Sequence, residues 1–139
     1  MDATKASAAA VPSAALAGAV DLLRELIRAA CVNDGSDTSG QEIRAVQVLQ
    51  RFLADVPAGS LPIEMQVFEA MPGRASLIAR VRGTDEAAPA LGLLGHLDVV
   101  PVDPNGWTRD PHAAELIDGA VWGRGAVDML YLTAVFACV

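Results

Sequence analysis

The chain has 139 residues, enough for one ordinary domain or for part of a larger one. Its formal net charge of -7 argues against binding to nucleic acid, because phosphate backbones require clusters of Lys and Arg. No run of about 20 uninterrupted apolar residues occurs, which argues against a membrane span.

Residues 1–15 are rich in alanine, and Pro12 and Ser13 interrupt them, so they do not resemble a signal peptide. We expect them to form a disordered tail ahead of one domain at residues 16–139. Cys31 and Cys138 are isolated in apolar segments, which predicts buried free thiols in a reducing compartment and therefore a cytoplasmic protein.

Two amphipathic helices are predicted in the first half of the chain. Residues 17–30 carry a single apolar stripe that faces away from the charged side chains. The stripe consists of Leu22, Leu23, Leu26 and Ile27. Ser39 is expected to cap the second helix, with Glu42 as its capping-box partner. Pro57 and Gly59 are expected to end that helix.

Strands are predicted in the middle of the chain. Residues 63–68 and 76–81 read as half-buried strands, the first from its alternation of apolar and polar residues. Residues 90–94 are almost purely apolar, which favours a strand covered on both faces. Together with the helices, these segments indicate an α/β fold.

The last third of the chain should contain a hairpin and a helix. Asp118-Gly119 between residues 115–117 and 120–122 is a strong signal for a two-residue hairpin turn. From Met129 the sequence is helical and apolar nearly all round, which predicts burial on more than one side. Because this helix has no capping residue before Val139, we expect the chain to be the N-terminal part of a longer protein.

Candidate metal ligands lie at the end of the apolar run. His96 and Asp98 are two residues apart, so a strand would place both side chains on one face. Imidazole is a good zinc ligand, and a neighbouring carboxylate can fix its tautomer. A structural His/Asp pair would explain the same pattern. Asp128 could bridge two metal ions or cap the following helix.

Three further side chains near these residues are expected to have structural roles. Arg124, between two glycines, should be an ion-pair partner, and His112 should be a surface histidine in a loop. Trp107 should pack its loop over the strand ends. The Gly-Arg-Gly turn lacks the lysine and spacing of a phosphate-binding loop.

Taken together, the segments GHLDVVPV (95–102), GWTRDP (106–111) and IDGAVWGRGAVDM (117–129) resemble a family of co-catalytic zinc metallopeptidases and amidohydrolases. The family includes aminoacylase, acetylornithine deacetylase, succinyl-diaminopimelate desuccinylase and glutamate carboxypeptidase. The resemblance implies that residues 16–139 are the N-terminal portion of a zinc-exopeptidase-type catalytic domain. This portion would be incomplete, with its helices packed on a mixed sheet.

The resemblance also implies roles for three residues. His96 would bind one zinc, Asp98 would orient that histidine, and Asp128 would bridge two zinc ions. A water held between the metals would attack the amide carbonyl of a small peptide or N-acyl amino acid. Co2+ and Mn2+ suit the same donors.

Several parts of the family's site are missing from these 139 residues. No glutamate follows Asp128, although the family places its general base and a further ligand in a Glu-Glu pair beyond it. The domain through which members commonly form homodimers is also absent. Leu130 and His112 depart from the family at positions that bind no metal. We therefore expect the chain alone to be inactive; the alternative is a truncated fragment that acts only through protein association.

Overall fold

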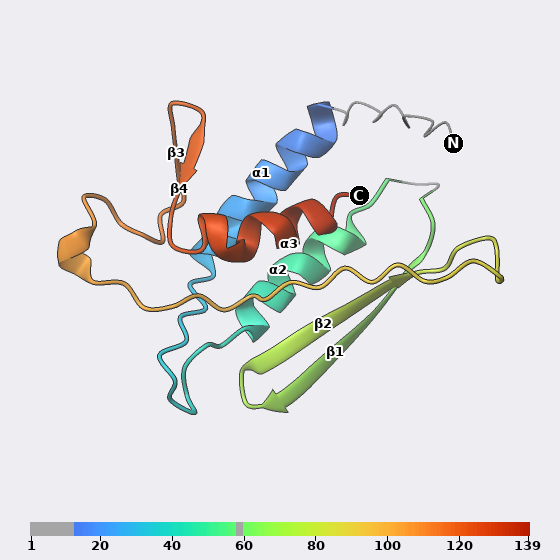
Figure 1. Ribbon diagram of the computed structural model, residues 1–139, viewed down its shortest axis with the longest axis horizontal. Coiled ribbons are helices and arrows are strands. Elements are labelled where there is room, and N and C mark those ends of the chain that lie inside the picture. Colours follow the sequence, from blue (N-terminus) through green and yellow to red (C-terminus); the bar gives the residue numbers. More distant parts are fainter. Residues whose placement is uncertain (1–12, 58–59) are drawn as a thin grey trace, which may run out of the picture.

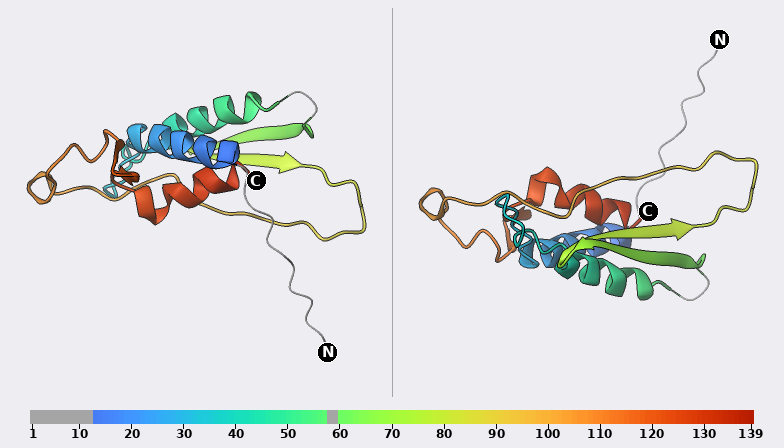
Figure 2. Two further views of the ribbon diagram at one scale, coloured as in Figure 1. Left: turned by 90° about the horizontal axis from the view of Figure 1, so that it is seen from above. Right: turned by 90° about the horizontal axis from the view of Figure 1, so that it is seen from below.

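The computed structural model describes residues 13–57 and 60–139. Helix α1 lies between α2 and α3, and two antiparallel hairpins extend from this group of helices (Figures 1 and 2). The elements in chain order are α1 (Ser13–Arg28), α2 (Ile43–Ala54), β1 (Ile63–Met71), β2 (Arg74–Val81), a short 3-10 turn (Pro104–Gly106), β3 (Glu115–Ile117), β4 (Ala120–Trp122), a π-turn (Ala126–Leu130) and α3 (Tyr131–Phe136).

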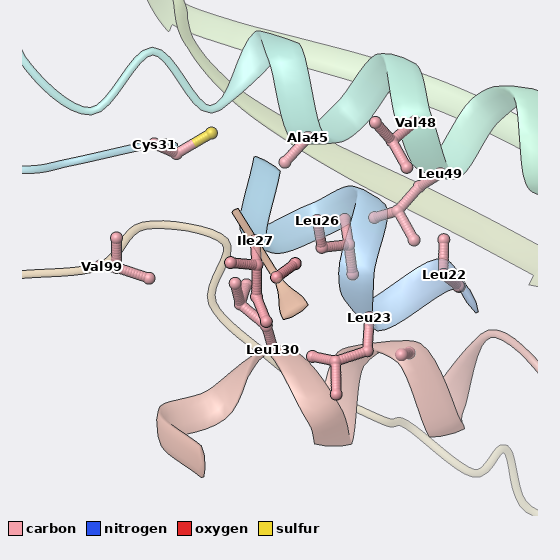
Figure 3. Close-up of a cluster of buried hydrophobic side chains, with 12 residues drawn as sticks. Leu22, Leu23, Leu26, Ile27, Cys31, Ala45, Val48, Leu49, Val99 and Leu130 are labelled. Atoms are coloured by element: carbon pink, nitrogen blue, oxygen red, sulfur yellow. The ribbon is translucent and has the colours of Figure 1, made fainter. Parts of the chain in front are cut away.

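The apolar stripe of α1 forms the centre of the core, as predicted. Leu22, Leu26 and Ile27 are at most 2% exposed and contact side chains from both neighbouring helices (Figure 3). Ala45 of α2 and Leu130, which directly precedes α3, belong to the same cluster. The helical period of 3.6 residues aligns the stripe, so α1 can bury one face against two partners.

The start of α1 corrects part of the predicted tail. Residues 13–15 are helical, whereas residues 1–12 lie outside the described part of the chain. The helix ends at Arg28, two residues earlier than predicted, and Ala30 follows with a left-handed φ of 49°. A left-handed residue cannot continue a right-handed helix.

The predicted capping box at the second helix is wrong. Gly40 and Gln41 both have left-handed φ, and these residues separate Ser39 from the helix, which begins at Ile43. The Ser39 hydroxyl instead donates to the carbonyl of Ser36 at 2.8 Å. Glu42 accepts a hydrogen bond from Arg74 Nε at 2.8 Å and is 7% exposed. The helix ends at Ala54, before Pro57.

The two predicted strands form one antiparallel hairpin, but they are less buried than expected. They are β1 and β2, each longer than predicted. Almost all of β1 is exposed, including Phe68 at 61%, while Ala75 of β2 is buried and Leu77 packs against the core. Alternating patterns predict a two-faced strand, but burial also requires an element to cover the apolar face.

Residues 90–94 do not form the expected buried strand. This segment makes no strand pairing within the described residues, and Leu91 and Leu94 are 85% and 91% exposed. In place of a mixed sheet, the described chain has two separate antiparallel hairpins and one parallel bridge between Val32 and Val99. The combination of helices and strands still confirms the α/β class.

The predicted second hairpin is confirmed. Strands β3 and β4 pair in register, and Asp118 and Gly119 between them have φ of 50° and 81°. Two consecutive left-handed residues are the conformation that a two-residue turn of this kind requires.

The last helix is less enclosed than its sequence predicts. Ala134 is buried in α3, whereas Tyr131 and Val135 are exposed. Cys31 is a buried free thiol, and Cys138 is free but only half-buried. Burial raises the pKa of both thiols. Among the described residues, no helix is both long and apolar enough to cross a membrane.

Candidate metal centre

The structure brings His96 and Asp128 together from positions 32 residues apart. The Nε2 atom of His96 lies 3.2 Å from Oδ1 of Asp128. The histidine follows the extended apolar segment, and the aspartate follows the glycine-containing turn after β4. The two side chains are 45% and 90% exposed, so solvent and ions can reach both donor atoms.

Asp98 contacts the other ring nitrogen of the same histidine. Nδ1 of His96 lies 2.9 Å from the backbone carbonyl oxygen of Asp98 and 3.5 Å from its carboxylate Oδ1. A carbonyl oxygen can only accept, so this hydrogen bond forms when Nδ1 carries the proton. The Nε2 lone pair of the neutral ring then faces the Asp128 carboxylate, so two hydrogen-bond acceptors lie against each other. A cation bound to both atoms would remove this repulsion.

These donors suit a transition metal, but they are few. Imidazole and carboxylate are ligands that Zn2+, Co2+ and Mn2+ all accept. Among the described residues, no group of three or more His, Cys, Asp or Glu side chains is arranged to hold a metal ion. The geometry therefore fits part of a metal site, since stable zinc sites use three or four protein ligands.

A pocket of about 490 Å³ surrounds these donors. Its lining consists of His96, Asp98, Val99, Val100, Gly123, Arg124, Gly125, Val127 and Asp128. A larger pocket of about 590 Å³ lies against α1 and α2 and contains none of the predicted site residues. The chemistry of the donors therefore identifies the smaller pocket as the candidate site.

The turn before Asp128 fixes where its carboxylate lies. Gly125 has φ of 84°, and a Cβ added there would collide with Val99 Cγ1 and meet Leu130 Cδ1 at 3.0 Å. Asp128 itself has extended backbone angles of -126° and 97°, followed by a cis peptide bond to Met129. The alternative that Asp128 caps the last helix is wrong, because Leu130 holds that position.

Replacing Gly125 by alanine should destabilise the chain by about 2–4 kcal/mol, combining a strained left-handed backbone with overpacking against the core. Urea denaturation measures this loss. Gly35→Ala is the matched control: it has φ of 88° but nothing within 4 Å of an added Cβ. If both variants lose equal stability, the close packing around Gly125 contributes nothing.

Arg124 and His112 differ from their predicted roles. The Arg124 guanidinium stacks over Trp107 at 5.5 Å, and Nη2 donates to the Pro101 carbonyl at 3.4 Å, so an aromatic ring replaces the expected ion-pair partner. Its Nε is buried without a hydrogen-bond partner in the described structure. His112 is half-buried, and its Nδ1 likewise has no partner among the described residues.

Sequence reasoning missed Asn33, which lies in the loop after α1. Its Nδ2 donates to Oδ2 of Asp98 at 2.9 Å, and its backbone N–H donates to Val99 O at 2.8 Å. Asn-Asp-Gly is a typical turn sequence, so nothing in the sequence suggested a contact between Asn33 and the distant Asp98. The parallel bridge between Val32 and Val99 brings the two segments together.

The loop that contains Asn33 also lowers the pKa of Asp34 to about 2, mainly through hydrogen bonds from the side chain and backbone of Ser36. The ordinary value is 3.8, so these bonds contribute fully above pH 4 and are lost as pH falls from 4 towards 2. Carboxyl NMR titration should find this midpoint. Ser36→Ala should raise it, and an unchanged midpoint would contradict the assigned cause.

Comparison with known proteins supports the predicted resemblance. Residues 92–139, which include all three predicted site residues, match Peptidase family M20/M25/M40. Succinyl-diaminopimelate desuccinylase of Phenylobacterium zucineum is 39% identical over 120 residues, covering 86% of this chain and 28% of that protein. The same enzyme of Gluconacetobacter diazotrophicus is 37% identical over 112 residues, covering 80% and 26%.

A shorter stretch is more similar still. The Rhodospirillum rubrum desuccinylase is 56% identical over 43 residues, covering 31% of this chain and 11% of that protein. The chain spans about a quarter of the length of the first two relatives, at 28% and 26%. The match over residues 92–139 and the similarity of most of the chain to these desuccinylases support a place for the chain in Peptidase family M20/M25/M40.

Proposed function

We propose that this chain supplies His96 and Asp128 to a dinuclear zinc site that hydrolyses the amide bond of a small N-acyl amino acid or peptide. The observation that carries the proposal is the 3.2 Å approach of His96 Nε2 to Asp128 Oδ1 within an open pocket. The names of the relatives favour an N-succinyl substrate.

Each of the three residues has a separate task in this proposal. His96 binds a metal through Nε2, because its Nδ1 proton is held by the carbonyl of Asp98. Asp128 offers an exposed carboxylate that can bridge two ions. The Asp98 carboxylate lies beside the ring and orients it. Bound zinc would polarise the carbonyl and lower the pKa of water.

The proposal also holds that the 139 residues alone do not catalyse the reaction. Two donors converge in the described structure, and no glutamate follows Asp128 to act as general base. We assign the missing ligands and the base to polypeptide that is not among these residues. A homodimer, if formed, would use other polypeptide as well.

A chimeric enzyme tests this function directly. The matched stretch of the Phenylobacterium zucineum desuccinylase would be replaced by residues of this chain, and succinate release measured with Zn2+. We expect turnover that a chelator abolishes and that is absent from the isolated chain. A folded, zinc-loaded chimera without turnover, or a fully active isolated chain, would contradict the proposal.

The exposed apolar segment supports a second candidate, in which the chain acts only by associating with another protein. Leu91 and Leu94 are at least 85% exposed in a segment that pairs with no strand in the described structure. Light scattering over a range of concentrations would then show association that is independent of metal. A zinc-binding monomer would exclude this candidate in favour of the first.

A further inference from the structure

We infer that Asn33 is a positioning residue of this site, which holds the Asp98 carboxylate against the ring of His96. Nδ2 of Asn33 donates to Oδ2 of Asp98 at 2.9 Å. The other oxygen of the same carboxylate lies 3.5 Å from Nδ1 of His96. The inference rests on the proposed function, because it concerns the histidine that would bind the metal.

The environment of Asn33 fixes which end of its amide meets Asp98. Its Oδ1 accepts a hydrogen bond from the backbone N–H of Gly35 at 3.0 Å. A backbone N–H can only donate, so the amide oxygen must face the loop and the NH2 group must face the carboxylate. The main chain is anchored as well, since the Asn33 N–H donates to Val99 O at 2.8 Å.

This contact acts on a histidine that lies between two carboxylates. Asp98 lies on the Nδ1 side of the ring, and Asp128 lies 3.2 Å from Nε2 on the other side. Each carboxylate favours the tautomer with the proton on its own side. By holding Asp98 in place, Asn33 favours the proton on Nδ1 and leaves the Nε2 lone pair available for a metal.

The test is the tautomer ratio of His96 in the metal-free chain, read from ring nitrogen NMR shifts at alkaline pH. In the wild type we expect the Nδ1–H form to predominate. Asn33→Ala should raise the ratio of Nε2–H to Nδ1–H by about two- to tenfold, the range that one ordinary hydrogen bond supports. Zinc titration of the same samples should show affinity about tenfold weaker.

A double mutant separates positioning from general support of the loop. Asp98→Ala should shift the ratio in the same direction, and adding Asn33→Ala should then change nothing further. Ser36→Ala removes the hydroxyl that bonds Asp34 in the same loop at 2.7 Å, contacts neither Asn33 nor Asp98 by a hydrogen bond, and should leave the ratio unchanged. Asn105→Ala is a second control, because its amide bonds a different aspartate, Asp103, at 3.2 Å.

If Asn33→Ala does not fold, Asn33→Asp replaces it, because an aspartate keeps the acceptor for the loop but exchanges the NH2 donor for a charged oxygen that repels the Asp98 carboxylate. A folded variant with an unchanged tautomer ratio would overturn the inference, as would an Asn33 effect that persists without Asp98. Failure of the proposed function gives a different result. The tautomer ratio would still change with Asn33→Ala, but zinc would cause no shift of the His96 signals in the wild-type chain.

Discussion

Substituting His96 by alanine should weaken zinc binding by at least about a hundredfold, more than the loss of a residue that only supports a ligand. The reason is that Nε2 of His96 is one of two donor atoms that converge in the pocket, and alanine leaves the Asp128 carboxylate without its neighbour. Isothermal titration of the 139-residue chain with Zn2+ measures the change. In the desuccinylase chimera, the same substitution should remove turnover.

The matched control is the only other histidine, His112. It is half-buried and does not line the pocket around His96. Replacing it by glutamine should leave zinc affinity unchanged. If His112→Gln weakens binding as much as His96→Ala does, the metal binds elsewhere and the proposed site is incorrect.

Replacing Leu26 by alanine should reduce the free energy of unfolding by about 3 kcal/mol, because it leaves a cavity at the centre of the helices. Leu26 is 1% exposed and belongs to the cluster that joins all three helices (Figure 3). Ordinary domains are stable by about 5–15 kcal/mol, so this loss is a large fraction of the total. Urea denaturation followed by circular dichroism measures it.

Leu16 on the same helix provides the control for this substitution. Its side chain is 59% exposed, so Leu16→Ala removes little buried surface and should change stability by less than about 0.5 kcal/mol. Similar losses at the two positions would contradict the packing explanation, because alanine has the higher helix propensity and the Leu16 side chain is mostly exposed.

The features that were predicted correctly are those determined within a few residues. The Asp118-Gly119 turn required only two residues that tolerate left-handed backbone, and both adopt it. The stripe of α1 required only a period of 3.6 residues. The family resemblance rested on motifs close together in sequence, and the match over residues 92–139 confirmed it.

The incorrect predictions concern features that depend on distant partners or on unexpected backbone angles. The apolar composition of residues 90–94 cannot specify which strand pairs with them. The capping box failed because Gly40 and Gln41 turn the chain away before the helix starts. The Arg124 guanidinium packs on the aromatic ring of Trp107 and not against a carboxylate. A guanidinium binds favourably to either group, so the sequence could not decide between them.

The candidate site was predicted in part. The approach of His96 to Asp98 follows from their spacing of two residues, although it is the backbone carbonyl that makes the shorter contact. The approach of Asp128 was expected from the family resemblance, and its exposed carboxylate could not be inferred from composition. Asn33 was not found, because its role requires a bond between residues 65 positions apart.

That long separation has a consequence for the order in which the chain folds. The turn between β3 and β4 has only two residues. Isolated hairpins with such short turns form in about 1–10 μs. The bonds from Asn33 to Asp98 and from Arg24 to the Ala114 carbonyl close loops of 65 and 90 residues, which carry the larger entropic cost. We therefore expect His96 to reach its final surroundings late, so that metal binding at this histidine would report the completion of folding.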